Sequence, residues 1–296
     1  MNTFGSDKAV TFRYPATANL MIDSADRPNP DTTTPYDFQI TRINSIVNGF
    51  FTRAGVTEVC LEWCQDNITS ANNFLTFDIS GIAPNTHAGA HQIVVPVGLY
   101  TAAGVIDSIV DSLNDLSGTT GCVFAVDNTA PPNGTNFSLT CDDGYYTVSG
   151  SALAVQLGLD FETSQLLPNT TSTALLLDCI DLRPYRYIDF VSAQLTYPQD
   201  LKDGSTQTLT RDVLCRWYFS EDTQEEVDGY GFPILMGYRR FCRRRIFNPP
   251  KQIKWDNNLP VGNLSFQVYD PDGNLLATPD HVEKNNFLLT IQLSEN

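Results

Sequence analysis

Apolar and polar residues alternate one by one along several short stretches of this chain. The alternation covers residues 36–41, 58–63, 75–80, 191–197, 213–219, 264–268 and 289–293. Glycine, proline, asparagine or aspartate bounds most of these stretches. A period of two turns one set of side chains toward a core and the other toward solvent, so each stretch predicts a half-buried strand. Such strands are typical of an antiparallel sandwich or barrel.

One stretch instead repeats its apolar residues at helical spacing, and three aspartates follow another face of the same helix at intervals of four. The apolar positions are 105, 106, 109, 110, 113 and 116. Thr101 is predicted to cap the N-terminus of this helix, and Gly118 is predicted to end it. A shorter helix is expected over residues 151–157, and a hairpin over 122–126 and 137–140 lies between the two helices.

The order of these elements predicts a mainly β protein in which an antiparallel sandwich is interrupted by a small α/β insertion. Residues 1–29 are interpreted as an N-terminal arm, 30–100 as the first part of the sandwich, 101–177 as the insertion and 178–296 as the second part of the sandwich. An insertion in a loop can add a function because it leaves the sandwich core undisturbed.

Charge is distributed unevenly along the chain. The 296 residues include 18 Lys and Arg against 34 Asp and Glu, which gives a formal net charge of −16. No Lys or Arg lies between Arg53 and Arg183, and fourteen acidic residues fall in that gap. The net charge argues against non-specific binding of nucleic acid or anionic membrane over most of the surface. No apolar run approaches the length of a membrane span.

Few residues suggest enzyme or metal chemistry. His87 and His91 lie in a loop-like segment without a third ligand, so we expect no metal site there. The segment that begins at Asp270 opens like a calcium loop, but a hairpin turn explains it better, because position twelve is His281 rather than Glu. No nucleophile motif or phosphate-binding loop is present. We therefore predict that the protein is not an enzyme and needs no cofactor.

A third hypothesis is a sandwich-fold enzyme, for example a carbohydrate-active one. It would rely on Asp142, in the adjacent pair Asp142–Asp143, or on Glu162. Adjacent carboxylates in a turn usually face solvent, so this pair does not by itself indicate catalysis. The seven cysteines are an odd number in a large chain and are expected to be free thiols of a reducing compartment.

A cluster of basic residues is the sharpest electrostatic feature, and it is the candidate interface. Seven of the 18 basic residues lie within sixteen positions: Arg239, Arg240, Arg243, Arg244, Arg245, Lys251 and Lys254. Aromatic and aliphatic residues are interleaved with them. One interpretation is a strip that binds an acidic partner protein or phosphates; the other is a strand whose arginines pair with acids of the same chain, such as the run at 221–228. Nucleic acid could bind only at this strip.

Several segments spread over most of the chain resemble structural proteins of double-stranded DNA viruses. They are IDSADR at 22–27, PYDFQI at 35–40, IVVPVGLYT at 93–101, SALAVQLGL at 151–159, YIDFVSAQL at 187–195, KDGST at 202–206, VLCRWY at 213–218 and PPKQIKW at 249–255. Taken together, they resemble the penton, or minor capsid, protein of virophages, polinton-like viruses and related viruses.

This resemblance implies a single jelly roll with an insertion. It implies a homopentamer that closes the icosahedral vertices of a capsid, beside a double-jelly-roll major capsid protein. The protein would be assembled inside the host cell and located in the virion, and no catalytic residue is carried over. The alternative is a spike or host-attachment module carried on the vertex, in which the acidic insertion meets a host-surface ligand.

Overall fold

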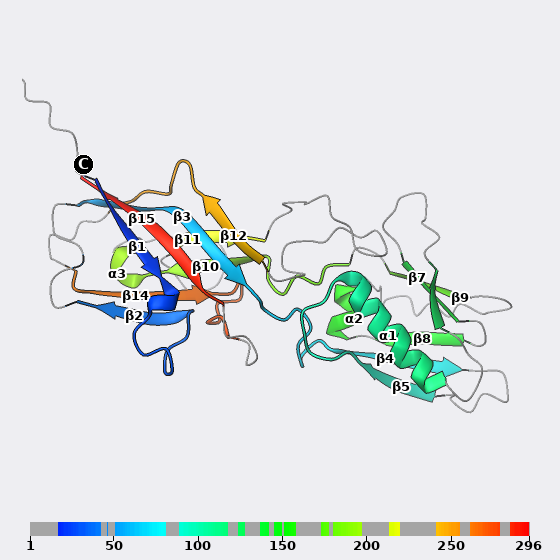
Figure 1. Cartoon of the computed structure of the whole chain (residues 1–296). Helices are drawn as coiled ribbons and strands as arrows, with labels where there is room; N and C mark the ends of the chain where they lie inside the picture. Colours follow the sequence, from blue (N-terminus) through cyan, green and yellow to red (C-terminus); the bar gives the residue numbers. More distant parts are fainter. Residues whose placement is uncertain are drawn as a thin grey trace, which may run out of the picture.

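The structure is a computed structural model of the whole chain (Figure 1). It describes residues 17–42, 46, 51–80, 89–117, 124–127, 137–141, 145–149, 151–157, 173–177, 180–196, 213–219, 241–254, 261–278 and 285–295. Two antiparallel sheets form a sandwich at one end of the chain trace, and two smaller three-stranded sheets with two helices form a second group beside it.

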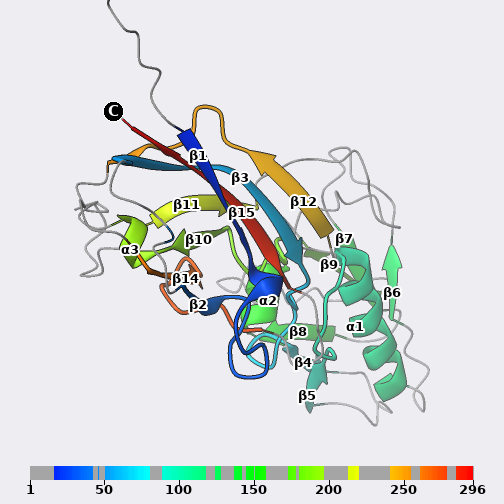
Figure 2. The ribbon, with the colours of Figure 1, turned by 60° about the vertical axis from the view of Figure 1, so that its left-hand side comes forward.

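Each sheet of the sandwich contains four main strands. The first sheet has the order β1 (Thr17–Asp23), β15 (Phe287–Ser294), β3 (Arg53–Trp63) and β12 (Phe241–Ile246), and the short β13 (Ile253–Lys254) also pairs with β3. The second sheet has the order β11 (Val213–Tyr218), β10 (Tyr187–Val191), β14 (Asn263–Tyr269) and β2 (Asp37–Thr41). Figure 2 shows the two sheets packed face to face.

The order in which the chain visits the sheets defines the fold. It runs from β1 in the first sheet to β2 in the second and back to β3; it then makes β10 and β11 in the second sheet. It returns to the first sheet for β12, crosses to β14 and ends at β15 beside β1. This eight-strand path is a jelly roll, so the predicted fold class is confirmed.

Alternation along the strands builds the core of the sandwich. In β15, Phe287, Leu289, Ile291 and Leu293 are buried, and the residues between them are partly exposed. Aromatic rings join the two sheets: Phe287 lies 5.9 Å from Phe38 and 5.0 Å from Phe190 between ring centroids. The apolar side chains of the alternating stretches therefore face the core, as predicted, because each sheet buries one face against the other sheet.

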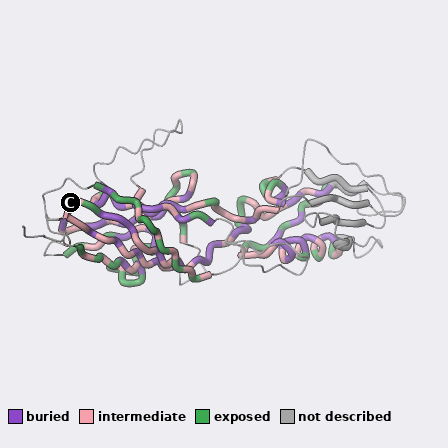
Figure 3. The backbone as a smooth tube through the Cα atoms, turned by 90° about the horizontal axis from the view of Figure 1, so that it is seen from above, coloured by how far each residue is buried: buried purple, intermediate pink, exposed green. Residues whose placement is uncertain are grey.

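The insertion has its own buried residues, separate from the core of the sandwich (Figure 3). One three-stranded sheet has the order β5 (Gly89–Val94), β4 (Phe74–Ser80) and β8 (Tyr145–Ser149), so it joins two strands that precede residue 101 to a strand of the insertion. The other sheet lies within the insertion and has the order β6 (Phe124–Asp127), β7 (Phe137–Cys141) and β9 (Thr173–Leu177). The helices are α1 (Ala102–Ser117) and α2 (Ala152–Gln156).

Both predicted helix starts are confirmed. The Gly104 N–H donates to Thr101 Oγ1 at 3.2 Å, and the Ala154 N–H donates to Ser151 Oγ at 3.2 Å. Each cap oxygen satisfies a backbone donor that has no partner within the first turn. Four residues of the apolar stripe of α1 are buried, namely Val105, Ile106, Ile109 and Leu113, and Asp107, Asp111 and Asp115 are exposed. The hairpin between the helices is also present, since β6 and β7 are antiparallel.

Strand pairing departs from the predicted boundaries at two places. β1 lies within the predicted arm, yet it pairs with β15 along its whole length. β4 and β5 lie within the predicted first part of the sandwich, yet they pair with each other and β4 pairs with β8 of the insertion. The alternation of apolar and polar residues predicts a half-buried strand but not the sheet that buries it, so the sequence does not place β1, β4 and β5 in their sheets.

The strand predicted over 191–197 is wrong at residues 192–196, and residue 197 lies outside the described part of the chain. β10 ends at Val191, and a short helix, α3 (Ala193–Thr196), follows it. Ser192 O accepts hydrogen bonds from the Leu195 N–H and from Thr196 Oγ1, which closes the turn. Leu195 and Thr196 are both buried, so a helical turn also satisfies the apolar spacing that was interpreted as a strand.

The segment at Asp270 forms the predicted turn. The Gly273 N–H donates to Asp270 O, and the Asn274 N–H donates to Asp270 Oδ1 at 2.8 Å. An antiparallel bridge between Tyr269 and Leu275 closes the hairpin. Among the described helices, none combines the length and the hydrophobicity needed to cross a membrane.

Candidate assembly interface

β12 is an edge strand of the first sheet and contains the central arginines of the basic cluster. It pairs with β3 in antiparallel register, with Arg243 opposite Leu61, Arg244 opposite Cys60 and Arg245 opposite Val59. Successive side chains of a strand point to opposite faces, so the three consecutive arginines cannot form one strip. Arg244 lies on the outer face, whereas Arg243 and Arg245 lie on the side that faces the second sheet.

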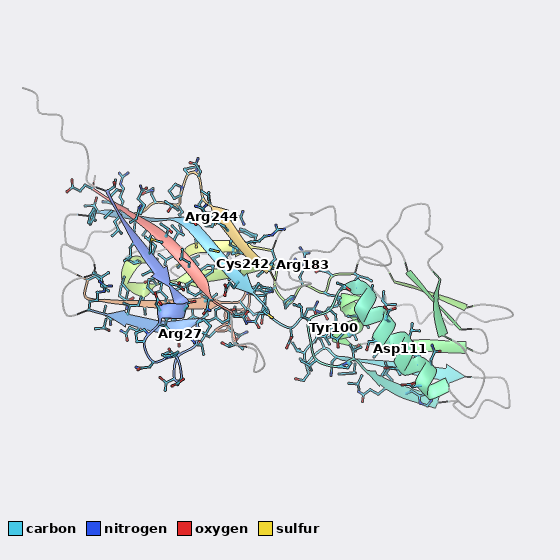
Figure 4. The ribbon with its side chains drawn as sticks, viewed as in Figure 1. Arg27, Tyr100, Asp111, Arg183, Cys242 and Arg244 are labelled. Atoms are coloured by element: carbon cyan, nitrogen blue, oxygen red, sulfur yellow. The ribbon has the colours of Figure 1, made fainter. Side chains whose placement is uncertain are left out.

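Arg244, which is labelled in Figure 4, pairs on the outer face with a carboxylate of the same chain. Its Nε and Nη2 groups donate to the two carboxylate oxygens of Glu58, and the Nη2–Oε2 distance is 2.7 Å. These hydrogen bonds, together with the positive charge of Arg244, lower the pKa of Glu58 below its usual range. The Arg244 side chain is 61% exposed, so a surface that docks here can still reach the guanidinium.

On the side of β12 that faces the second sheet, Arg245 and Phe241 pack against aromatic rings. The Arg245 guanidinium carbon lies 6.0 Å from the centroid of the Trp217 ring and 5.6 Å from that of Phe247. The Phe241 ring stacks on Trp63 at 6.3 Å and meets Phe219 edge-on at 6.3 Å. Cation–π contacts and ring packing therefore fix β12 against the second sheet.

The segment after β12 positions the two lysines of the cluster. Lys251 Nζ donates to Val213 O at 3.0 Å, and this bond joins the segment to the beginning of β11. Lys254 belongs to β13 and lies opposite Arg53. Gly55 makes room for the segment, because a Cβ at this position would lie 2.9 Å from Lys251 O. The described members of the cluster are therefore spread along β3, from Arg243 opposite Leu61 to Lys254 opposite Arg53, and Lys251 contacts the beginning of β11.

Several predicted residues lie outside the described part of the chain. They are Arg239, Arg240, His87, His281, Asp142, Asp143, Glu162 and the acidic run at 221–228. His91 belongs to β5, opposite Phe77. Within the described ranges, no group of three or more His, Cys, Asp and Glu side chains could hold a metal ion.

A second arginine site, which the sequence interpretation missed, lies on the outer face of the second sheet. Asp189 of β10 is fully buried, and Arg216 of β11 donates to its two carboxylate oxygens at 2.6 and 2.9 Å. The guanidinium carbon of Arg216 lies 3.8 Å from the Tyr187 ring and 5.9 Å from the Tyr218 ring. The sequence did contain a signal for this pair, because each of the two strands has a single charged residue among mostly apolar ones. A charge buried in a strand normally needs a partner of opposite charge.

A third arginine joins the sandwich to the insertion. Arg183 donates to both carboxylate oxygens of Asp181, at 2.8 and 2.6 Å, and to Phe219 O at 3.2 Å. The Asp181 N–H donates to Gln156 O at the end of α2. Burial acts to raise the pKa of Asp181, but the hydrogen bonds and charge of Arg183 outweigh it and leave that pKa lowered.

Comparison with known proteins identifies the fold. No protein-family model and no curated protein sequence matches the chain. A crystal structure of the mavirus penton protein matches with a TM-score of 0.55 at 13% identity, over 96% of this chain and 100% of that chain. A chain of the cryo-EM structure of the Sputnik virophage matches with a TM-score of 0.50 at 12% identity, over 95% of this chain and 98% of that chain. The protein thus shares the fold of the mavirus penton protein over almost its whole length.

Proposed function

We propose that this protein is a structural capsid protein that closes the icosahedral vertices of a virion as a homopentamer. The observation that carries the proposal is the match to the mavirus penton protein, which spans both the sandwich and the insertion. A shared sandwich alone would support little, because jelly rolls serve many functions. A match that includes the insertion as well supports the same role for the whole chain.

A ring of five subunits places one requirement on the surface of each subunit. Its interfaces are heterologous, so each subunit must present two different surfaces that complement each other. The chain is polarised in the required way, since no Lys or Arg lies between Arg53 and Arg183 while the basic cluster is concentrated at 239–254. We propose that this cluster meets an acidic surface of a neighbouring subunit or of the major capsid protein, and that the charges steer the encounter.

The contacts of the cluster favour a protein partner over nucleic acid. Arg244 is bonded to Glu58, Arg245 lies over Trp217, and Lys251 is bonded to Val213. Side chains held in this way form a shaped surface with some exposed donors, whereas a binder of the phosphate backbone needs a continuous positive track. We propose that nucleic acid binds weakly, if at all, at this site.

Two measurements test the vertex role. The purified protein is expected to show the mass of five chains by native mass spectrometry, and a cryo-EM map of particles should contain it at the fivefold positions. A protein that stays monomeric at all concentrations and is absent from the vertices would overturn the proposal. Titration with a short DNA duplex at low and physiological salt tests the weaker claim: tight binding at physiological salt would contradict it.

The second candidate is a host-attachment module carried by the insertion. It is favoured by the separate construction of this part, in which α1 and α2 contain buried residues that lie outside the sandwich core. The insertion also contains many acidic residues and no basic ones. Deletion of the insertion separates the two functions, because loss of attachment with assembly intact assigns attachment to it, and loss of assembly assigns it a structural role.

A further inference from the structure

The outer face of the first sheet brings two cysteines from distant parts of the sequence into contact. Cys60 of β3 and Cys242 of β12 are 182 positions apart, and their Sγ atoms are 3.8 Å apart. Cys242 is exposed and Cys60 is partly exposed, so a reagent in solution can reach the pair. The two residues are diagonal neighbours, because Cys60 lies opposite Arg244 and Cys242 lies opposite Glu62.

We propose that Cys60 and Cys242 form a redox-controlled disulfide that fixes β12, the strand carrying the centre of the basic cluster, to β3. Within the described residues, β3 is the strand with which β12 pairs. The two sulfurs must approach by about 2 Å to form a disulfide bond, and rotation of the two cysteine side chains can supply most of this distance while β12 keeps its contacts with the second sheet. A covalent link to β3 would then hold Arg243, Arg244 and Arg245 in one register.

The oxidant we infer is a small-molecule disulfide such as oxidised glutathione. The Cys242 thiolate attacks one of its sulfurs, the sulfur–sulfur bond breaks, and one glutathione leaves as a thiolate that takes up a proton. The Cys60 sulfur then attacks the Cys242 sulfur of this mixed disulfide and releases the second glutathione. Two protein thiols are oxidised and one glutathione disulfide is reduced, so protons and electrons balance.

The order of attack follows from the surroundings of the two thiols. Burial, reinforced by the hydrogen bond with Cys242, raises the pKa of Cys60 to about 11, so Cys60 rarely supplies the first thiolate. Cys242 is the more exposed of the two and meets the oxidant first. Once the mixed disulfide has formed, Cys60 already lies beside it, so the second step is intramolecular and fast.

The test uses the full-length folded protein in glutathione buffers of increasing oxidation, followed by acid quench, alkylation and peptide mapping. The expected product is a cross-linked peptide pair containing Cys60 and Cys242, with the loss of two hydrogen masses per chain. Cys215 serves as an internal control: it is buried and burial raises its pKa, so it should stay a thiol in the glutathione buffers and be recovered as an alkylated peptide.

Single variants sharpen the result. In Cys60→Ser the reaction should stop at the mixed disulfide on Cys242, which should accumulate to a level about tenfold above that in the unmodified protein. In Cys242→Ser both products should be nearly absent. A stable mixed disulfide on Cys242 in the unmodified protein, or cross-links to other cysteines instead, would overturn the proposal. The peptide map of the unmodified protein decides the question even if a variant fails to fold.

Discussion

The outer face of each sheet contains an arginine–carboxylate ion pair, and the two pairs differ in how deeply they are buried. On the second sheet, Arg216 holds a carboxylate that is fully buried, and its guanidinium stacks on Tyr187. On the first sheet, Arg244 holds Glu58 in a similar two-point contact, but the Arg244 side chain is 61% exposed. Both pairs join neighbouring antiparallel strands, so the geometry of the contact does not distinguish them.

Burial is the difference that decides what each pair does. A buried carboxylate cannot be rehydrated when its partner leaves, so the Asp189–Arg216 pair must hold for β10 and β11 to stay folded as they are. An exposed pair exchanges its partner for water at little cost, and Arg244 can therefore give up Glu58 for a docking surface. We infer that Arg216 stabilises the second sheet, whereas Arg244 of the first sheet is available to bind a neighbouring protein.

The largest expected effect is on the buried pair. Arg216→Met keeps much of the side-chain volume but leaves the Asp189 carboxylate buried without its guanidinium. We expect a loss of about 3 kcal/mol in the free energy of unfolding, at the low end for a broken buried pair because Arg216 itself is 30% exposed. Urea denaturation followed by tryptophan fluorescence measures this loss.

The matched control for this variant is Arg244→Met, which breaks the exposed pair in the same way. Its urea midpoint should stay close to that of the unmodified protein. The double variant Asp189→Asn with Arg216→Met should recover part of the lost stability, because the buried charge is gone. Equal losses in Arg216→Met and Arg244→Met would refute the distinction between the two faces.

A glycine on the first sheet tests how the basic cluster is held. Gly55→Ala would place a Cβ 2.9 Å from Lys251 O, which is a backbone atom and cannot rotate away. We expect a cost of about 1–3 kcal/mol from this overpacking, measured by thermal or urea denaturation. Gly262→Ala is the control, since its Cβ would meet Arg42 O at an ordinary 3.5 Å. Similar costs for both variants would show that the 251 segment does not need Gly55.

The sequence predicted the fold class because a jelly roll is built from half-buried strands. β2, β3, β11, β14 and β15 all contain an alternating stretch, α1 begins after its predicted cap residue Thr101, and α2 lies within the range predicted for the shorter helix. Assignment to sheets could not be predicted in the same way. β1 pairs with β15 at the opposite end of the sequence, as in Leu20 opposite Ile291, and the spacing of side chains in one strand carries no trace of such a partner.

The basic cluster was visible in sequence, but its arrangement was not. Seven charges within sixteen positions stand out in composition, whereas the strand period splits Arg243 and Arg245 from Arg244. The partner of Arg244 is also remote in sequence, because Glu58 lies 186 positions away. The Asp189–Arg216 pair was missed because two isolated charges 27 positions apart form no motif until the strands pair.

Arg244→Gln should affect assembly more than folding. It removes an exposed charge at the proposed interface, so we expect weaker association of subunits and a flatter dependence of that association on salt. The urea midpoint of the isolated chain should barely change. Sedimentation velocity over a range of sodium chloride concentrations measures the first effect. Arg42→Gln, which alters an exposed arginine after β2, should leave association unchanged, and an equal loss there would point to net charge instead.

The smallest effect is a change in one titration curve. Hydrogen bonds from Arg244 lower the pKa of Glu58, so the pair stabilises the fold above the usual glutamate pKa of about 4.3, and this contribution is lost as the pH falls through the lower folded value. In Arg244→Gln the pKa of Glu58 should rise toward its usual value, which carboxyl carbon shifts in NMR report directly. Asp181 is the internal reference, because Arg183 still holds its pKa low in this variant. If the pKa of Glu58 does not change while that of Asp181 stays low, Arg244 does not set the pKa of Glu58. The first sheet would then lack the exposed, exchangeable ion pair on which the contrast between the two faces depends.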